Sequence, residues 1–173
     1  MSRPADLSLP APAPEAAAHS HALAEAIAGQ IAEAGGWIPF SRYMELVLYA
    51  PGLGYYAAGA RKIGGEGDFV TAPEISPMFA RCLAMQARQV MERSAAEILE
   101  LGPGTGVLAA DLFAELKALG SAPRKYRLLE VSADLRERQR AYIASRHPED
   151  LDRFEWLESL PPALDGFVVA NEV

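Results

Sequence analysis

The sequence predicts a doubly wound α/β fold preceded by a helical, loop-rich region at the N-terminus. After residue 95, short apolar runs alternate with helical stripes, which is the order expected of a parallel sheet with crossover helices. Before residue 95, apolar residues recur at helical spacing around a long segment crowded with glycine. We therefore expect a disordered tail, a helical and loop region, and the N-terminal half of a sheet domain, over residues 1–14, 15–94 and 95–173.

The N-terminal region divides at its prolines and glycines. Four prolines within residues 1–14 leave few backbone donors, which indicates the disordered tail. Apolar residues spaced by four predict a helix over residues 15–34 that ends at Gly35. A second helix is predicted over residues 41–49, with Ser41 as its N-cap.

A glycine-rich segment and a third helix follow. Residues 52–75 are too long for an ordinary connection, so we expect a lid or binding loop there. Ser76 followed by Pro77 is a strong start signal for a helix that continues to about Arg93. Cys82 on this helix is expected to be a small buried or half-buried side chain. The predicted inward stripe consists of Phe79, Leu83, Gln86, Ala87 and Val90.

The C-terminal half contains the expected strands and the helices between them. Ser132 is predicted to cap one of these helices, with Asp134 in the first turn, where the helix dipole favours an anion. The last expected strand is apolar and ends close to Val173. Natural domains cover such an edge strand because it would otherwise pair with other chains, so we expect this chain to be the N-terminal piece of a longer protein. The expected strands are EILEL, YRLLEV, the short RFEW and FVVA, at residues 97–101, 126–131, 153–156 and 167–170.

The composition is that of a globular protein and excludes several classes. A net charge of -7 argues against non-specific nucleic-acid binding, although it would attract a basic substrate. One cysteine and three histidines offer neither a disulfide nor metal-ligand spacing, so no metal site is expected. The sequence has no signal-peptide pattern and no run of about 18 apolar residues. We therefore expect a protein of the reducing cytoplasm without a membrane segment.

The stretch ELGPGTG, residues 100–106, is the strongest candidate binding site. Four interpretations compete: a packing turn, a phosphate-binding P-loop, a dinucleotide site, and a site for S-adenosylmethionine. The P-loop is excluded because it needs Gly-Lys-Ser/Thr, and Thr105 follows Gly104 instead of lysine. A dinucleotide site needs G-x-G-x-x-G/A, and Gly104, Gly106 and Ala109 satisfy its relaxed form.

The pattern of an S-adenosylmethionine site fits the turn at each position. Glycines carry no Cβ, so the backbone can approach a cofactor closely. An acid at the strand end suits a cofactor with cationic groups but would repel a pyrophosphate. Glu130, after the second strand, can accept hydrogen bonds from ribose hydroxyls, which both cofactor types require, and a plain surface glutamate is its alternative. The pattern E-x-G-x-G-x-G is matched by Glu100, Gly102, Gly104 and Gly106.

Five longer motifs resemble the MidA-like methyltransferases, whose mitochondrial members are complex I assembly factors that methylate arginine. They are RYMELVLYAPGLGYY, GDFVTAPEISPMF, LELGPGTG, LEVSADLRERQ and ANEV, at residues 42–56, 67–79, 99–106, 129–139 and 170–173. The sequence departs from the family at Ala80, where the family more often has glycine. The resemblance implies a Rossmann-like class I methyltransferase sheet that continues past residue 173, of which this chain holds strands 1–4 in truncated form.

The resemblance also implies a cofactor, a substrate and a set of site residues. The cofactor would be S-adenosyl-L-methionine, and the substrate a protein arginine, on a subunit of the respiratory complex I type. Asn171 and Glu172 would lie at the end of the fourth strand, on the sheet edge where ligands bind. Further cofactor-binding roles would fall to Thr71, Pro73, Glu74, Ser76, Gly102, Gly104 and Glu130, with Glu100 and Gly106 of the turn pattern beside them.

An arginine acceptor would need a carboxylate, because its guanidinium is always protonated and is a poor nucleophile. Glu172 is the first candidate to orient it, with Glu74 second, although Glu172 could instead bind the cofactor or cap the next helix. Asp68 could meet the substrate or pair with Arg61 or Lys62 in its own loop. Two other hypotheses stay open: an assembly module that keeps the cofactor fold without turnover, and an NAD-dependent oxidoreductase.

Overall fold

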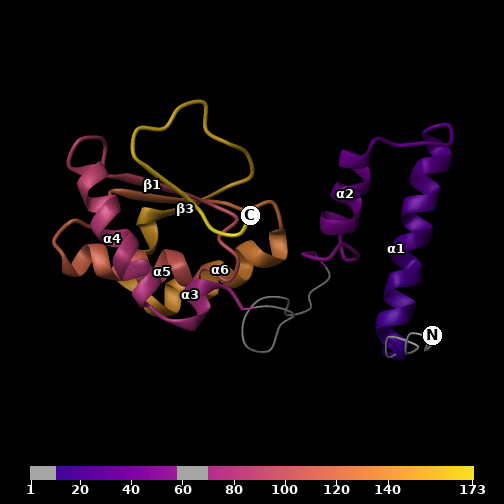
Figure 1. Ribbon diagram of the computed structural model, residues 1–173, viewed down its shortest axis with the longest axis horizontal. Coiled ribbons are helices and arrows are strands. Elements are labelled where there is room, and N and C mark those ends of the chain that lie inside the picture. Colours follow the sequence, from indigo (N-terminus) through magenta and orange to yellow (C-terminus); the bar gives the residue numbers. More distant parts are fainter. Residues whose placement is uncertain (1–10, 58–69) are drawn as a thin grey trace, which may run out of the picture. The chain divides into compact units, whose positions relative to one another are not determined.

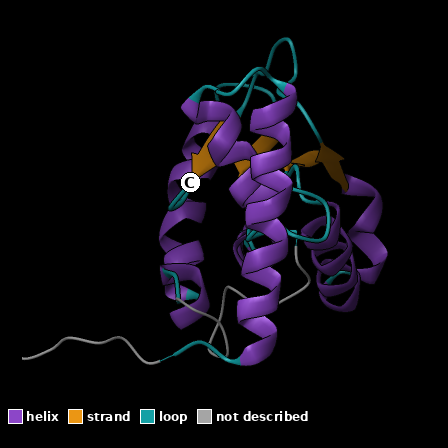
Figure 2. Ribbon diagram, turned by 90° about the vertical axis from the view of Figure 1, so that its right-hand side faces the viewer, coloured by secondary structure: helices purple, strands orange, loops and turns teal. Residues whose placement is uncertain are grey.

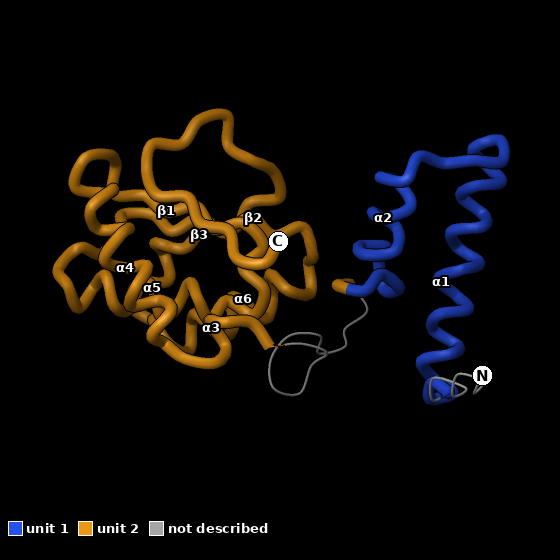
Figure 3. The backbone as a smooth tube through the Cα atoms, in the orientation of Figure 1, with its two compact units in different colours: residues 1–55 blue, residues 56–173 orange. Residues whose placement is uncertain are grey.

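The computed structural model describes residues 11–57 and 70–173. The chain divides into two compact units, Met1–Tyr55 and Tyr56–Val173, which Figure 3 shows in different colours. The segment before the sheet thus belongs to the same unit as the sheet, and the unit boundary lies at residue 55 and not at residue 94. The predicted loop residues Arg61, Lys62 and Asp68 lie outside the described residues.

The first unit contains the two predicted N-terminal helices, α1 (Pro14–Glu33) and α2 (Phe40–Tyr49). Ile27 is the buried residue of the α1 stripe, and Arg42 of α2 donates a hydrogen bond of 3.1 Å to the Gln30 side chain. The prediction that Ser41 caps α2 is wrong, because the helix starts one residue earlier. Its first turn closes instead on the Pro39 carbonyl, which accepts from the Arg42 and Tyr43 N–H groups at 2.9 and 3.1 Å.

The second unit is built on a four-stranded parallel sheet in the order β3-β2-β1-β4. Figures 1 and 2 show the strands as one layer with the helices of this unit against it. The predicted first and last strands are confirmed with their bounds unchanged, and the other two differ from prediction by one or two residues at an end. The strands are β1 (Glu97–Leu101), β2 (Lys125–Leu129), β3 (Phe154–Leu157) and β4 (Phe167–Ala170).

One face of the sheet is covered by helices, and the hydrophobic core lies there. Ile98 pairs with Tyr126 and with Phe167 across the strands, so these side chains project from the same face. Phe113 and Leu112 of α5 pack against them with no exposed surface. The covering helices are α4 (Met78–Met91), α5 (Val107–Ala118) and α6 (Ala133–Arg146), and a 3-10 turn, η1 (Pro148–Arg153), leads into β3. This arrangement of a parallel sheet and covering helices is Rossmann-like, as predicted.

Helix α4 packs through a face that overlaps the predicted one in part: Ala87 is buried and Phe79 and Leu83 pack against the core, whereas Gln86 is exposed. Its buried residues are a stripe of alanines with a terminal methionine, and Val90 is exposed. Small side chains let α4 come close to α5. The alanine stripe therefore turns inward, although larger apolar residues lie elsewhere on the helix. Cys82 lies on the outer side of this stripe and is exposed, so the prediction of a buried or half-buried cysteine is wrong. The buried stripe is Ala80, Ala84, Ala87 and Met91.

Ser76 makes the hydrogen bond predicted for it at the start of α4, but the helix begins one residue later than predicted. Ser76 Oγ accepts a hydrogen bond of 3.1 Å from the Met78 N–H, as an N-cap side chain does, while the helix is assigned from Met78. Part of the predicted lid, residues 72–75, forms a short helix, α3 (Ala72–Ile75). This helix contacts both α4 and α5, which brings the predicted loop against the sheet unit.

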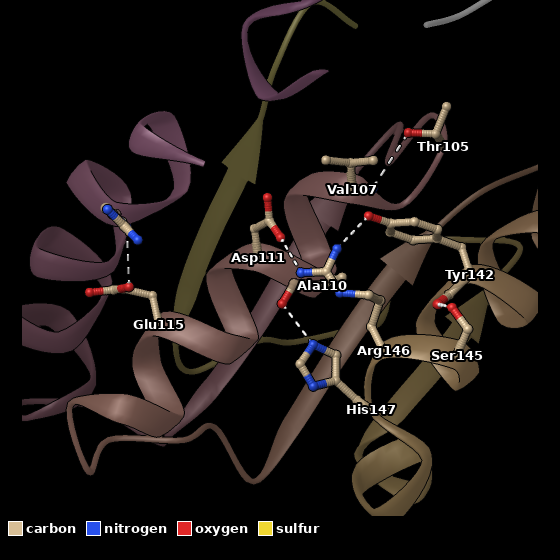
Figure 4. Close-up of polar contacts among 10 residues, drawn as sticks. Thr105, Val107, Ala110, Asp111, Glu115, Tyr142, Ser145, Arg146 and His147 are labelled. Atoms are coloured by element: carbon tan, nitrogen blue, oxygen red, sulfur yellow. Dashed lines mark hydrogen bonds and ion pairs between the residues drawn. The ribbon is translucent and has the colours of Figure 1, made fainter. Parts of the chain in front are cut away.

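Polar contacts hold the C-terminal end of α6 to α5 (Figure 4). Arg146 donates 3.0 Å to Asp111 and 2.8 Å to the Tyr142 hydroxyl, and His147 Nε2 lies 2.9 Å from the Ala110 carbonyl oxygen. The two helices therefore have a fixed register. That register matters because the other end of α6 carries residues of the candidate site.

Candidate functional site

The strand order places a topological switch point between β1 and β4. The chain moves outward from β1 through β2 to β3 on one side, and β4 lies on the other. In open parallel sheets, ligands bind beside the carboxyl ends of the strands at this point. The turn Gly102–Gly106 follows β1 there, and Asn171 and Glu172 follow β4.

The turn after β1 adopts a backbone that favours glycine at three positions. Gly102, Gly104 and Gly106 have φ angles of 58°, 55° and 84°, all in the left-handed region. The Gly102 N–H donates 3.1 Å to the Leu129 carbonyl at the end of β2. A Cβ built on Gly102 would collide with Val173 Cγ1, so the chain beyond β4 lies directly against this turn. The strand ends of β1, β2 and β4 thus meet at one place.

Glu130, just after β2, is buried, and its carboxylate accepts from Gln139 and from the backbone N–H groups of Val131 and Ser132. Its Oε1 accepts 2.8 Å from the Ser132 N–H, and its Oε2 accepts 3.2 Å from Gln139 Nε2. Burial raises the pKa of Glu130, and these hydrogen bonds to the charged form act in the opposite direction. Ser132 also accepts from the Leu135 N–H at 3.3 Å, which confirms it as the cap of α6. Glu130 therefore lies at the start of α6 and is not a surface glutamate.

Glu100 stands apart from the other candidate residues. Its side chain is 3% exposed, and its Oε2 accepts 2.6 Å from the Tyr126 hydroxyl on β2. Burial raises the pKa of Glu100 to about 7, against the lowering effect of that hydrogen bond. The carboxylate lies on the core side of β1 with Ile98, because residues two apart in a strand share a face. Its direct contact with a cofactor stays a prediction.

The predicted lid residues reach the turn through Glu74. Thr105 Oγ1, in the glycine turn, donates to Glu74 Oε1 of α3. Thr71 lies immediately before α3 and Pro73 within it, and both are partly exposed. The Ser76 hydroxyl accepts from the start of α4, as described above. The structure therefore brings Glu74 into contact with the glycine turn. Thr71, Pro73 and Ser76 are neighbours of Glu74 in the sequence.

Glu172 is a strained residue at the switch point. Its φ is 54°, the one positive value among the described residues other than glycine. Its side chain is exposed, and Asn171 before it is partly buried. Left-handed backbone in a residue with a side chain is uncommon and clusters at functional sites, which agrees with the candidate role of Glu172.

The structure adds two residues to the candidate site, Gln139 and Trp156, and gives Thr105 of the turn a partner on α3. Gln139 of α6 donates 2.8 Å to the Gly104 carbonyl, Trp156 of β3 donates 2.9 Å to Gln139, and Thr105 binds Glu74. The one sequence signal was a glutamine on the inward, otherwise apolar side of α6. Within residues 11–57 and 70–173, no three of the His, Cys, Asp and Glu side chains gather as a metal site would need. None of the described helices is long and apolar enough to cross a membrane.

Comparison with protein families matches residues 78–173 to one family, described as "Putative S-adenosyl-L-methionine-dependent methyltransferase". Among curated proteins, the mitochondrial protein arginine methyltransferase NDUFAF7 of Danio rerio is 35% identical over 127 residues. The mitochondrial NDUFAF7 homolog of Drosophila melanogaster is 37% identical over 123 residues. These alignments cover 69% and 66% of this chain but only 30% and 28% of the two relatives.

Solved structures match more of the chain. A COG1565 superfamily member from Burkholderia thailandensis, crystallised with S-adenosyl-homocysteine, is 50% identical and superimposes with a TM-score of 0.84. The match covers 96% of this chain and 44% of that one. A second crystal structure from the same organism and superfamily gives 48% identity and a TM-score of 0.80. The chain thus spans less than half the length of each of these relatives.

Proposed function

Because this chain belongs to the S-adenosyl-L-methionine-dependent methyltransferase family matched over residues 78–173, we propose that it binds S-adenosylmethionine and serves methyl transfer to a protein arginine. The cofactor would lie at the carboxyl ends of β1 and β2, against the turn Gly102–Gly106. The observation that carries this proposal is the turn itself, which has three left-handed glycines beside a buried, oriented carboxylate. A solved relative in this superfamily was crystallised with S-adenosyl-homocysteine.

The residues present fit the cofactor. The glycine turn presents backbone without a Cβ, with Gly102 exposed and Gly104 partly exposed, and its neighbour Glu130 keeps unused acceptor capacity. The Glu130 carboxylate accepts from the Ser132 N–H, Gln139 Nε2 and the Val131 N–H, whereas a carboxylate can accept about four hydrogen bonds in total. A ribose hydroxyl could therefore still donate to it. Asn171 and Thr71 are proposed to complete the cofactor contacts from the β4 end and the start of α3.

The arginine assignment rests on the named activity of the curated relatives and on Glu172. The bound cofactor would supply a methyl group attached to a positive sulfur. We propose that Glu172 orients the acceptor guanidinium and concentrates its charge on the nitrogens that do not react. In that transfer the nitrogen would form the new bond to carbon, the sulfur would keep the electron pair of the broken carbon–sulfur bond, and the proton given up by the nitrogen would pass to solvent. Glu74 is the second candidate, although Thr105 already donates to its carboxylate.

A methyl-transfer assay with paired peptides tests the reaction. The chain would be incubated with methyl-labelled cofactor and an arginine–glycine peptide, or with its twin in which lysine replaces arginine. We expect label in the arginine peptide alone, and a loss of at least about a hundredfold in kcat for Glu172→Gln. Label in the lysine peptide alone would contradict the arginine assignment. Tight S-adenosylhomocysteine binding with neither peptide labelled would favour the assembly module without turnover.

The cellular partner and compartment are separate proposals. The two NDUFAF7 relatives described above are named as mitochondrial, while the composition of this chain leads us to expect the cytoplasm. We propose a protein substrate of the respiratory complex I type. Mass spectrometry of methylarginine in complex I subunits, with and without the gene for this chain, would test it. Unchanged methylarginine in every subunit would rule that substrate out.

A further inference from the structure

Gln139 is the most completely engaged polar side chain near the glycine turn. It lies on the inner side of α6 with 0% of its surface exposed. Its Nε2 donates 2.8 Å to the Gly104 carbonyl and 3.2 Å to Glu130 Oε2, and its Oε1 accepts 2.9 Å from Trp156 Nε1. One side chain therefore bonds the residues that follow β1 and β2 and a residue of β3.

The chemistry of its partners fixes the orientation of this amide. The Trp156 indole nitrogen can only donate, and the Gly104 carbonyl and the Glu130 carboxylate can only accept. A flipped Gln139 amide would set donor against donor and acceptor against acceptor, with Gln139 and Glu130 buried. Trp156 is itself held from outside by Arg140, whose guanidinium carbon lies 4.4 Å from the ring centroid. The amide consequently has one arrangement that satisfies its neighbours.

This arrangement ties the glycine turn to the Glu130 carboxylate. Both Nε2 bonds converge on one nitrogen, so the Gly104 carbonyl oxygen and Glu130 Oε2 lie no farther apart than the two bonds together. The other carboxylate oxygen is held by the Ser132 N–H. Glu130 is thus restrained at both oxygens, and one of those restraints is shared with the turn. Loss of the amide would free the Glu130 carboxylate from the turn, while the turn keeps its own bond from the Gly102 N–H to the Leu129 carbonyl.

We propose that Gln139 is a positioning residue that sets the Glu130 carboxylate, relative to the glycine turn, for the cofactor's ribose hydroxyls. This inference rests on the proposed cofactor site. Trp156, Gln139 and Glu130 form a series of hydrogen bonds. Under this inference, all three residues contribute to recognition of the cofactor's ribose. Because Gln139 would act through Glu130, its effect should depend on the ribose hydroxyls and on no other part of the cofactor.

Calorimetric titration with two ligands tests this dependence. The ligands are S-adenosylhomocysteine and its analogue that lacks both ribose hydroxyls. We expect Gln139→Met to lower the affinity for S-adenosylhomocysteine by about tenfold or more, and to change the affinity for the analogue by less than about threefold. Glu137→Met, at an exposed position of the same helix, should alter neither affinity.

Other outcomes distinguish the role of Gln139 from the cofactor site on which it rests. An equal loss for both ligands, or no loss for either, would overturn the role of Gln139 and leave the cofactor site standing. Failure of the unmodified chain to bind S-adenosylhomocysteine would overturn the proposed function and this inference with it. If Gln139→Met does not fold, Trp156→Phe decides, because it keeps an aromatic ring at this position and removes the indole donor. It should give a smaller loss with the same dependence on the hydroxyls, and an unchanged affinity would refute the inference.

Discussion

Glu100 holds its carboxylate in a nearly dry part of the sheet, and this makes stability depend on pH. Burial raises its pKa from an ordinary value of 4.5 to about 7. The folded chain therefore binds this proton more tightly than the unfolded chain does. The stability contributed by the group is complete below about pH 4.5 and is lost as pH rises through about 7.

Glu100→Gln should remove that dependence, because an amide can still accept from Tyr126 and cannot ionise. Between pH 5 and 8, the difference in unfolding free energy between variant and parent should move in favour of the variant. The upper limit is roughly 1.4 kcal/mol for each unit of pKa shift. Urea unfolding of both proteins at the two pH values measures it. Parallel pH profiles would show that Glu100 does not titrate in this range.

Gly104 is the residue where the cofactor proposal can be tested with little effect on the fold. Valine at its φ of 55° would distort the turn and place a branched side chain where the cofactor is expected. Gly104→Val should lower S-adenosylhomocysteine affinity by at least about tenfold in calorimetry, while circular dichroism remains that of the parent. Gly120→Val is the matched control, since its φ is 69° and the position is open. Equal affinity of the two variants for S-adenosylhomocysteine would show that the turn is not part of the cofactor site.

At the scale of the elements, β4 depends on a glycine at its entrance. A Cβ on Gly166 would overlap the Glu97 backbone carbonyl, which cannot move aside as a side chain could. Gly166→Ala should therefore shift β4 away from β1 and destabilise the chain by about 2 kcal/mol. Gly120→Ala meets no atom within 4 Å and should cost about 1 kcal/mol for its left-handed backbone alone. Thermal unfolding compares them, and equal losses would contradict the packing explanation.

The sequence allowed the strands to be predicted better than the helix faces. EILEL and FVVA were predicted with correct bounds, because buried parallel strands are continuous apolar runs. The inward face of α4 was predicted only in part, because its larger residues suggested one stripe while the closest packing is made by alanines next to it. The cap of α2 was assigned to Ser41 by residue preference, whereas Pro39 supplies the first carbonyl of the helix.

The candidate site was predictable where its residues follow a strand directly. The glycine turn, Glu130 and Glu172 all come immediately after strands, so strand order alone brings them to one edge. Gln139 and Trp156 could not be placed in the same way. Their bonds join residues 9 to 35 positions apart, and only the packing of α6 on the sheet determines which partners they meet.

At the scale of the whole molecule, the sheet has two unlike faces. Helices α4, α5 and α6 cover the face that holds the core (Figure 1). On the other face, Arg127 pairs with Glu97 and Glu155, and Val168 of β4 is 51% exposed. The glycine turn and the Gln139 network belong to the covered side. The proposed cofactor contacts with the turn and Glu130 are therefore organised by residues that this chain supplies itself.

Calorimetric titration of the chain with S-adenosylhomocysteine and, separately, with NAD tests this account most directly. Both cofactors could use a glycine turn and an acid after the second strand, so the turn alone does not separate them. The account predicts saturable one-to-one binding of S-adenosylhomocysteine and no binding of NAD. Saturable NAD binding without binding of the adenosyl cofactor would contradict it.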